Sequence, residues 1–370
     1  MERFKVHLIV GARPNFMKMA PLYKEFKNYS DLFDVKLIHT GQHYDEKMSK
    51  LFFDDLGMPQ PDEYLQVGSG SHAQQTAKIM EKYEEVLLKD KPNLVIVCGD
   101  VNSTIACALD AVKLHIPVSH LEAGLRSYDK RMPEEINRLP TDVISDFLLI
   151  PSEDARENLH KEGVADEKIY FVGNIMIDSL VEHKQKAEES TILQDLGIVD
   201  DKYALITLHR PSNVDDFEGL SVIINAFEEI ANKIKLVFPV HPRTIKNIEK
   251  FNLKEKVESI SNLKLTEPVG YLDFMKLQMN ANFILTDSGG IQEESTFFNI
   301  PCLTLRENTE RPITITLGSN QLVKLTTQDI ILKANEIING KIKKGVIPPL
   351  WDGKTAVRIV ELFIDKYKKV

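Results

Sequence analysis

The feature that most constrains the fold is an alternation of short apolar runs with longer amphipathic stretches. In the first half of the chain, the expected strands cover residues 5–10, 35–39, 94–98, 118–121 and 147–150. Amphipathic stretches at 73–88 and 103–114 separate some of them, and we expect these to be helices. Strands that are apolar on both faces and alternate with helices form parallel sheets covered on both sides.

The same pattern restarts in the second half of the chain. Expected strands cover residues 203–208, 235–240, 263–266, 283–286 and 302–305, with a helix at 217–233. A chain of 370 residues is long for one hydrophobic core. We therefore predict an α/β protein with two doubly wound, Rossmann-like domains, at 1–175 and 176–354. The final stretch, 355–370, places apolar residues on one face and is expected to be an amphipathic helix.

Composition narrows the class of protein. With 43% hydrophobic and 27% charged residues, the chain is typical of a soluble globular protein. Its net charge of -9 argues against nucleic-acid binding, and no apolar stretch reaches the roughly 20 residues of a membrane span. The cysteines Cys98, Cys107 and Cys302 lie in apolar contexts without metal-ligand spacing. We expect a cytoplasmic protein with buried thiols and no metal site.

The loops after the first-half strands carry charged residues. Ligands of open parallel sheets bind beyond the carboxyl ends of the strands. Arg13 and Lys18 bracket a helix start after the first strand, which suits a phosphate, although a solvated turn is the alternative. Asp100, Glu122 and Glu134 follow later strands or open a helix. Each could serve helix capping alone, but three carboxylates at one sheet edge suggest acid–base chemistry.

The second half repeats this arrangement. His209 and Arg210 follow its first strand, and His241 follows its second, where an isolated histidine is more often structural. The stretch TDSGGIQEE places Ser288, Gly289 and Gly290 at a helix start, with Glu294 about one turn further on. Bare amides suit a phosphate, and the carboxylate can accept both hydroxyls of a ribose. The sequence therefore predicts a nucleoside diphosphate site, with a plain helix start and two solvated glutamates as the alternative.

One formal dinucleotide motif is disfavoured. Residues 68–73 fit G-x-G-x-x-[GA], but the strand before them is short, and Asp90 follows a helix rather than ending a strand. No cofactor is expected.

Nine motifs in order cover nearly the whole chain: GARPNFMKMAPL, TGQH, GDVNST, HLEAGLRS, MPEEINR, VGN, LHRPSN, TDSGGIQEE and RENTERP. Together they resemble the non-hydrolysing UDP-N-acetylglucosamine 2-epimerases. The resemblance implies the glycosyltransferase-B architecture, with the active site in a central cleft between the two domains and the last helix returning to the first. It also implies a homodimer through first-domain helices, and a reaction that needs neither metal nor nicotinamide. In that reaction UDP is eliminated to give 2-acetamidoglucal and is then re-added.

The resemblance also carries over site residues. The catalytic candidates are Asp100, Glu122, Glu134 and His209. The substrate-binding candidates are Arg13, Lys18, Arg210, Phe274, Ser288, Gly289, Gly290, Glu294 and Arg311. The candidates for a second, activating UDP-N-acetylglucosamine site are Gln42, His43, Arg210 and His241.

Departures from the family pattern leave alternatives open. Ala12 and Asn15 replace the usual threonine and glutamate of the first loop. Enzymes that act on UDP-2,3-diacetamido-uronic acids share the Gly-Ala-Arg-Pro loop, so such a sugar is an alternative substrate. A hydrolysing epimerase is disfavoured by Arg13-Pro14, and a glycosyltransferase or a non-catalytic nucleotide-sugar sensor has no use for three carboxylates. Tyr44-Asp45 departs from the activator pattern, which leaves allosteric activation undecided.

Overall fold

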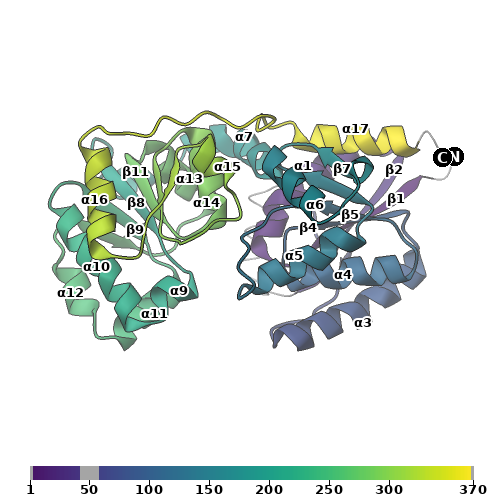
Figure 1. The fold of residues 1–370 in the computed structure, drawn as a ribbon, viewed down its shortest axis with the longest axis horizontal. Helices are drawn as coiled ribbons and strands as arrows, with labels where there is room; N and C mark the ends of the chain where they lie inside the picture. Colours follow the sequence, from purple (N-terminus) through teal and green to yellow (C-terminus); the bar gives the residue numbers. More distant parts are fainter. Residues whose placement is uncertain (1–2, 42–57, 368–370) are drawn as a thin grey trace. The chain divides into compact units, whose positions relative to one another are not determined.

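The computed structural model describes residues 3–41 and 58–367. The chain divides into two compact units (Figure 1). Unit 1 comprises Met1–Ser179 and Pro349–Val370, and unit 2 comprises Leu180–Pro348. Each unit contains one sheet, and every strand pair in both sheets is parallel. The predicted α/β class with two Rossmann-like sheets is confirmed.

The sheet of unit 1 has seven strands in the order β3-β2-β1-β4-β5-β6-β7. The strands are β1 (Phe4–Val10), β2 (Phe33–His39), β3 (Glu63–Tyr64), β4 (Leu94–Cys98), β5 (Val118–Leu121), β6 (Phe147–Ile150) and β7 (Ile169–Phe171). The strand order reverses direction between β1 and β4, which is where doubly wound sheets bind their ligands. The loops that begin at Gly11 and Gly99 follow these two strands.

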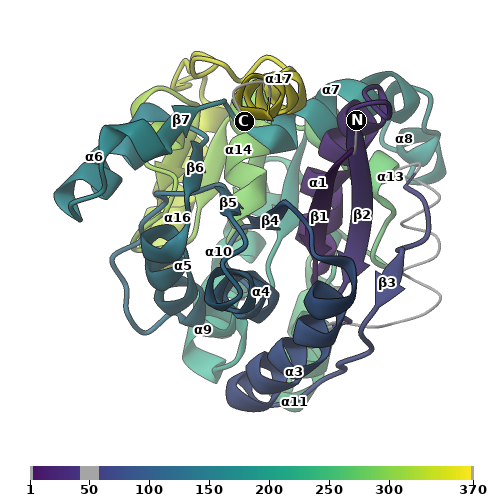
Figure 2. The same ribbon diagram turned by 90° about the vertical axis from the view of Figure 1, so that its right-hand side faces the viewer.

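Helices cover both faces of this sheet (Figure 2). Those of unit 1 are α1 (Arg13–Lys27), α3 (His72–Asp90), α4 (Asn102–Lys113), α5 (Pro133–Ile144), α6 (Glu153–Lys161) and α17 (Thr355–Tyr367), with the start of α7 (Ile175–Glu188) and a 3-10 turn, η1 (Asp166–Lys168). Helices α3 and α4 pack on one face, against Ile9, Ile38, Val95 and Val97. Helices α1 and α17 contact each other on the other face.

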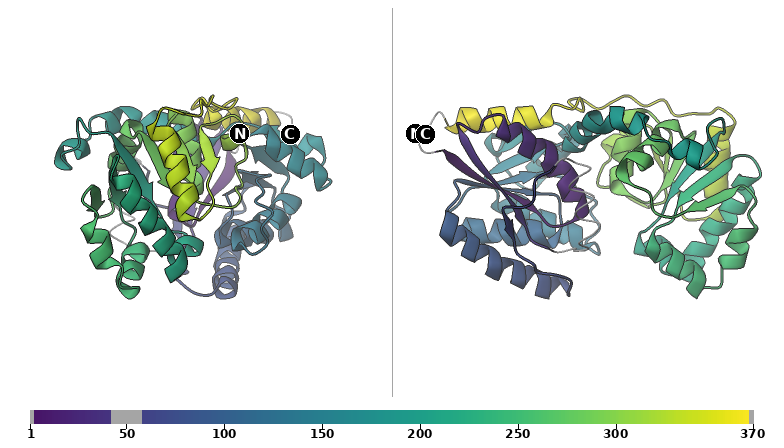
Figure 3. Two further views of the ribbon diagram at one scale, coloured as in Figure 1. Left: turned by 60° about the vertical axis from the view of Figure 1, so that its left-hand side comes forward. Right: turned by 180° about the vertical axis from the view of Figure 1, so that it is seen from behind.

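The sheet of unit 2 repeats the same order with six strands, β10-β9-β8-β11-β12-β13. Figure 3 shows the elements of this unit, drawn mostly in green, from two further sides. The strands are β8 (Tyr203–Thr207), β9 (Lys235–Pro239), β10 (Leu263–Thr266), β11 (Phe283–Thr286), β12 (Cys302–Thr304) and β13 (Asn320–Leu322). The helices are α8 (Ile192–Asp195), α9 (Pro211–Val214), α10 (Phe217–Ala231), α11 (Pro242–Lys250), α12 (Lys254–Ser259), α13 (Tyr271–Asn280), α14 (Gly289–Phe298), α15 (Ile313–Thr316) and α16 (Thr327–Ile338). The switch point lies between β8 and β11.

Strand β8 shows why both faces of the unit 2 sheet are buried. Ala204 and Ile206 pack with residues of α10 and α16, whereas Tyr203 and Leu205 pack with residues of α8 and α13. Successive side chains of a strand point to opposite faces, so a strand buried on both faces must be apolar throughout. This is the pattern from which the strands were predicted.

The C-terminal residues are anchored within unit 1. The indole of Trp351 donates a hydrogen bond to the carbonyl of Pro151, at 3.0 Å. The Asp178 carboxylate accepts from the first amides of α17, those of Thr355 at 3.1 Å and Ala356 at 2.8 Å. These contacts satisfy amides that a helix start leaves unpaired.

Among the helices that the structure describes, none has the length and apolar character needed to cross a membrane.

Candidate active site

Glu122 and Lys18 form a buried ion pair at the carboxyl edge of the unit 1 sheet. Glu122 follows β5 directly and holds a left-handed backbone, with φ of 71°. This conformation is uncommon for a residue with a side chain and marks a constrained position. Its Oε1 atom is buried and has no hydrogen-bond partner among the described residues. The carboxylate therefore keeps one oxygen available for a ligand.

Asp100, which follows β4, lies in a second network. Its Oδ2 pairs with Arg138 of α5, and its side chain is 29% exposed. Arg138 also pairs with Glu135, whose carboxylate accepts from the backbone amides of Ser127 and Tyr128. Asp100 is thus held by α5 but remains partly exposed, so a ligand can reach it.

Four other candidates belong to unit 1. Glu134 is exposed in the first turn of α5, next to the buried Glu135. Arg13 is the first residue of α1, and only its backbone is described. Gln42 and His43 lie outside the described residues. The structure therefore brings together Lys18 and Glu122, and it places Asp100 on the adjacent strand end.

In unit 2, His209 and Asp287 form a dyad at the switch point. His209 follows β8, and its Nδ1 lies 3.1 Å from Oδ1 of Asp287. Asp287 is fully buried and also accepts from the backbone amides of His209 and Arg210. Burial alone would raise the pKa of Asp287, but the His209 ring and these amides outweigh it and lower the pKa. An ionised Asp287 fixes the orientation of a ring that is itself partly exposed.

A cluster of arginines and glutamates lies beside the start of α14. Arg311 pairs with Glu310 at 2.7 Å and with Glu293 at 2.9 Å. Arg306 and Arg210 also contact Glu310, at 2.8 and 3.7 Å. Burial would raise the pKa of Glu310, but the neighbouring arginines hold it well below its usual range.

Ser288 is the N-cap of α14, and Gly289 and Gly290 are its first residues. A Cβ atom at Gly289 would lie 2.7 Å from Nη1 of Arg311, so glycine permits this close approach. Bare helix amides next to an arginine form a typical anion site.

Glu294 lies one turn further along α14, and it is buried. Gln278 donates a hydrogen bond to its Oε2 at 2.5 Å. Burial raises the pKa of Glu294 to about 7. Two buried atoms close by, Oε1 of Gln278 and the hydroxyl oxygen of Tyr271, have no hydrogen-bond partner among the described residues. Unsatisfied buried polar atoms are rare in proteins and often await a ligand or a water molecule.

Two other candidates in unit 2 have structural contacts. Phe274 is partly buried and packs against the cluster that contains Leu277 and Ile291. His241 is the N-cap of α11, where its Nδ1 accepts from the amide of Arg243 at 3.2 Å. Its ring centre lies 5.9 Å from that of His209.

Sequence reasoning assigned no site role to Asp287, Glu310, Glu293, Gln278, Glu135, Arg138 or Asn15. Asn15 joins the first loop to β4, since it accepts from the amide of Ala12 and donates to the carbonyl of Cys98. Asp287 and Glu310 lie inside quoted motifs, and the position of Asp287 directly after β11 was a usable signal. No group of three or more His, Cys, Asp or Glu side chains in residues 3–41 and 58–367 is placed to hold a metal ion.

The two parallel sheets, each with its polar loops at the switch point, define an α/β protein of the glycosyltransferase-B type. A solved lipopolysaccharide outer core galactosyltransferase shares this fold, with a TM-score of 0.57 at 15% identity over 98% of this chain and 100% of that one. The model of the UDP-N-acetylglucosamine 2-epimerase family matches residues 24–364. The chain belongs to this family.

Similar proteins cover almost the full length. A UDP-N-acetylglucosamine 2-epimerase from Methanocaldococcus jannaschii is 44% identical over 97% of this chain and 98% of that protein. The crystal structure of the enzyme from that organism in complex with UDP-GlcNAc and UDP has a TM-score of 0.89, and it covers 98% of this chain and 99% of that one. A UDP-2,3-diacetamido-2,3-dideoxy-D-glucuronate 2-epimerase from Pseudomonas aeruginosa is 41% identical over 96% of this chain and 98% of that protein.

Proposed function

We propose that the protein reversibly converts UDP-N-acetylglucosamine to UDP-N-acetylmannosamine without hydrolysing it. The observation that carries this proposal is the buried Lys18–Glu122 pair beside Asp100, in a chain of the 2-epimerase family. A protein that only bound a nucleotide sugar would gain nothing from a buried carboxylate with an unpaired oxygen, because burying such a group costs free energy.

The proposed reaction has two halves. A base removes the proton from carbon 2, and the bond between carbon 1 and the UDP oxygen breaks with its electron pair going to UDP. The product is 2-acetamidoglucal. In the second half, UDP adds back to carbon 1 while carbon 2 receives a proton on the opposite face. The carbon-2 proton is weakly acidic, so departure of UDP must run ahead of its removal.

The residues divide between these tasks. In unit 2, Arg311 and the α14 amides would stabilise the charge that builds on the departing pyrophosphate, and Glu294 would accept from the ribose hydroxyls. Arg13 and Lys18 would support the same charge from unit 1. Asp100, Glu122 and Glu134 are the candidates for proton transfer at carbon 2. His209, oriented by Asp287, is either an acid for the departing UDP or a phosphate ligand.

Solvent exchange tests the reaction directly. The protein is incubated with UDP-N-acetylglucosamine in deuterated water, and the products are followed by NMR. We expect deuterium at carbon 2 of a sugar that is still linked to UDP. Free N-acetylmannosamine with free UDP would instead identify a hydrolysing enzyme.

Variants separate proton transfer from nucleotide binding. Loss of a proton-transfer group typically lowers the rate about 10²–10⁴-fold. We expect Asp100→Asn and Glu122→Gln to lose that much turnover and exchange, while UDP affinity stays within a few-fold. Glu294→Gln should do the reverse, weakening UDP binding by roughly 1–3 kcal/mol with a smaller effect on turnover. If a carboxylate variant exchanges deuterium at the wild-type rate, Glu134 or His209 becomes the leading base.

A UDP-2,3-diacetamido-uronic acid is the second candidate substrate. It is favoured by the Gly-Ala-Arg-Pro loop and by the 41% identity to the Pseudomonas aeruginosa enzyme. Initial rates with both sugars at equal concentration decide between them, since the true substrate should show the higher kcat/KM.

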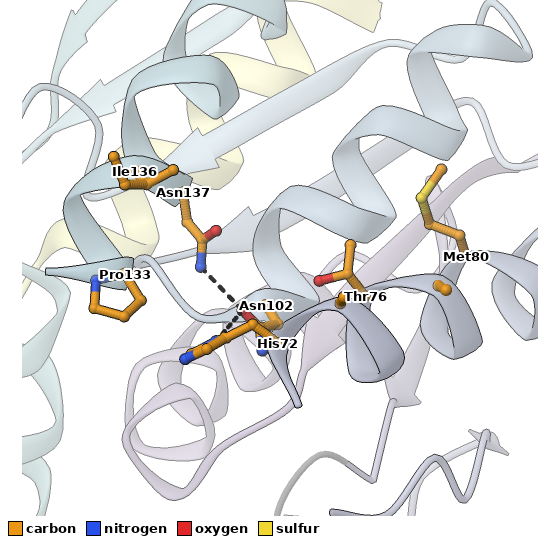
Figure 4. Close-up of a pocket in the computed structure, with 9 residues that line it drawn as sticks. His72, Thr76, Met80, Asn102, Pro133, Ile136 and Asn137 are labelled. Atoms are coloured by element: carbon orange, nitrogen blue, oxygen red, sulfur yellow. Dashed lines mark hydrogen bonds between the residues drawn. The ribbon is translucent and has the colours of Figure 1, made fainter. Parts of the chain in front are cut away.

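We also propose that the protein is a homodimer that associates through α3 and α5. A pocket of about 550 Å³ lies between these helices and is lined by Thr76, Met80, Pro133 and Ile136 among others (Figure 4). Ile136 is 51% exposed, and Val143, two turns further along α5, is 66% exposed. Apolar side chains that a monomer leaves in water are typical of an interface.

Sedimentation tests the dimer. We expect the wild type to sediment as a dimer and Val143→Lys as a monomer. Val199→Lys, at an exposed valine of unit 2, is the matched control and should remain dimeric. A wild-type monomer at micromolar concentration would contradict the proposal.

Activation by a second UDP-N-acetylglucosamine molecule stays a prediction, with Arg210 and His241 as its described candidates. The test starts the reaction from UDP-N-acetylmannosamine alone. A lag in product formation would support activation if added UDP-N-acetylglucosamine removes that lag.

The three cysteines are buried and free, which supports a cytoplasmic location for this activity.

A further inference from the structure

His120 of β5 is completely buried and bridges two elements of unit 1. Its Nδ1 lies 2.5 Å from Oδ1 of Asp142, which belongs to α5. Its Nε2 lies 2.8 Å from the carbonyl oxygen of Gly99, the residue between β4 and Asp100. The ring therefore connects the loops that carry two of the candidate carboxylates.

Both partners of this ring are acceptors. A backbone carbonyl has no proton to donate. Asp142 already accepts at Oδ2 from the amide of Gly124, at 3.1 Å, and from Arg126, at 2.7 Å. The guanidinium of Arg126 and the amide of Gly124 are both donors, and such contacts favour the ionised form of the Asp142 carboxylate. With a carboxylate on one side and a carbonyl on the other, the ring can donate in both contacts only if both of its nitrogens carry hydrogen.

The network extends to the backbone around Glu122. Asp142 accepts a hydrogen bond from the amide of Gly124, two residues after Glu122. Arg126, which pairs with Asp142, also forms an ion pair with Glu162 at 2.6 Å. Gly99 approaches Glu122 closely, since a Cβ atom there would lie 3.6 Å from Glu122 Oε2. A shift of His120 would therefore move the backbone next to both Asp100 and Glu122.

We propose that His120 carries hydrogen on both ring nitrogens and is a positioning residue, which with Asp142 sets the geometry of Asp100 and Glu122 for proton transfer. This inference rests on the proposed epimerisation only for its kinetic consequence. The protonation state and its contacts can be tested without any turnover.

The first test is NMR of the wild-type protein labelled with ¹⁵N-histidine. The signals of His120 are assigned by their absence from His120→Gln. We expect two protonated ring nitrogens with similar chemical shifts at neutral pH. One protonated nitrogen and one pyridine-like nitrogen would identify a neutral ring and overturn the proposal, whether or not the protein is an epimerase.

The second test is kinetic. Misplacing a catalytic group by about 1 Å can cost about 10²-fold in rate. We expect His120→Gln to lower kcat by about that factor, while KM and UDP affinity stay within about threefold. His160→Gln, at an exposed histidine that pairs with Asp166, is the matched control and should keep wild-type kinetics.

A raised KM with unchanged kcat, or unchanged kinetics in a folded His120→Gln, would contradict positioning. If His120→Gln does not fold, Asp142→Asn provides a second route. We expect the wild-type His120 signals to lose the imidazolium pattern in that variant, because its acceptor charge is gone. An unchanged pattern would overturn the role of Asp142. If the wild type shows no epimerase activity, the proposed function fails, and the NMR result still decides the state of His120.

Discussion

At the scale of single residues, four buried carboxyl groups of this protein illustrate two kinds of environment. Asp142 and Asp287 face cations and amides, which hold each pKa below its usual range although burial acts the other way. Asp110 and Glu294 have no paired cation, and burial raises each pKa to about 7. The first kind orients its neighbours as an ion, whereas the second kind changes charge near neutral pH.

Glu294 should make substrate binding depend on pH. Ribose hydroxyls donate to an ionised carboxylate, so binding favours the form that dominates above a pH of about 7. We expect affinity for UDP-N-acetylglucosamine to fall as pH drops below this value, by up to about tenfold per unit. This sugar diphosphate is the better probe because UDP itself takes up a proton near neutral pH. Calorimetry on Glu294→Gln is the control, and the same pH dependence there would contradict the assignment.

Asp110 should make stability depend on pH. Its carboxyl group is buried, and its Oδ2 has no hydrogen-bond partner among the described residues. Since the folded-state pKa of about 7 exceeds the ordinary value, folding retains a proton, and stability falls as pH rises towards 7. We expect Asp110→Asn to raise Tm by a few degrees at pH 8 and by less at pH 5. Asp365→Asn, at an exposed position of α17, should change Tm little at either pH.

At the scale of elements, strands of four or more residues were predictable and shorter edge strands were not. The strands β4, β5, β6, β10 and β11 begin and end where the sequence predicts, because each has at least two apolar residues within a run of four or five. The strands β3, β7 and β13 were missed. Each has at most three residues, lies at a sheet edge and is partly exposed, so it carries too little apolar pattern to recognise.

The residues of the candidate site were also only partly predictable from the sequence. The residues that follow strands were predictable, because parallel strands bring their carboxyl ends to one edge. Their partners were not. Arg138 reaches Asp100 from α5, and Gln278 reaches Glu294 from α13. Such contacts between distant segments arise from helix packing, and no local spacing encodes them.

The start of α14 allows a comparison of two adjacent glycines. A Cβ atom at Gly290 would meet nothing within 4 Å, whereas one at Gly289 would lie 2.7 Å from Arg311. Alanine in a helix lowers the entropy of the unfolded chain, so we expect Gly290→Ala to stabilise the protein by up to about 1 kcal/mol. Gly289→Ala should lack this gain and also weaken UDP binding, since Arg311 must move. Chemical unfolding and calorimetry measure both, and equal stabilisation by the two variants would count against this contact.

At the scale of the whole molecule, the single tryptophan offers a probe of one unit. Trp351 is the only tryptophan in the sequence, and it is buried in unit 1. Its fluorescence should therefore follow the unfolding of unit 1, while calorimetry follows both units. Proteins with two domains commonly depart from two-state unfolding, so the two signals need not coincide.

The fluorescence of Trp351 tests whether UDP binds mainly to unit 2. Asp178→Ala removes the acceptor for the first amides of α17, and loss of such a cap costs about 1–2 kcal/mol. We expect it to lower the fluorescence transition and to leave the remaining calorimetric transition in place. A ligand stabilises the part that binds it. Since the groups assigned to the nucleotide are concentrated in unit 2, UDP should raise mainly the transition that Trp351 does not report. If UDP raised the fluorescence transition as much as the other, nucleotide binding would have to be reassigned to both units, and Arg13 and Lys18 would become the first residues to vary.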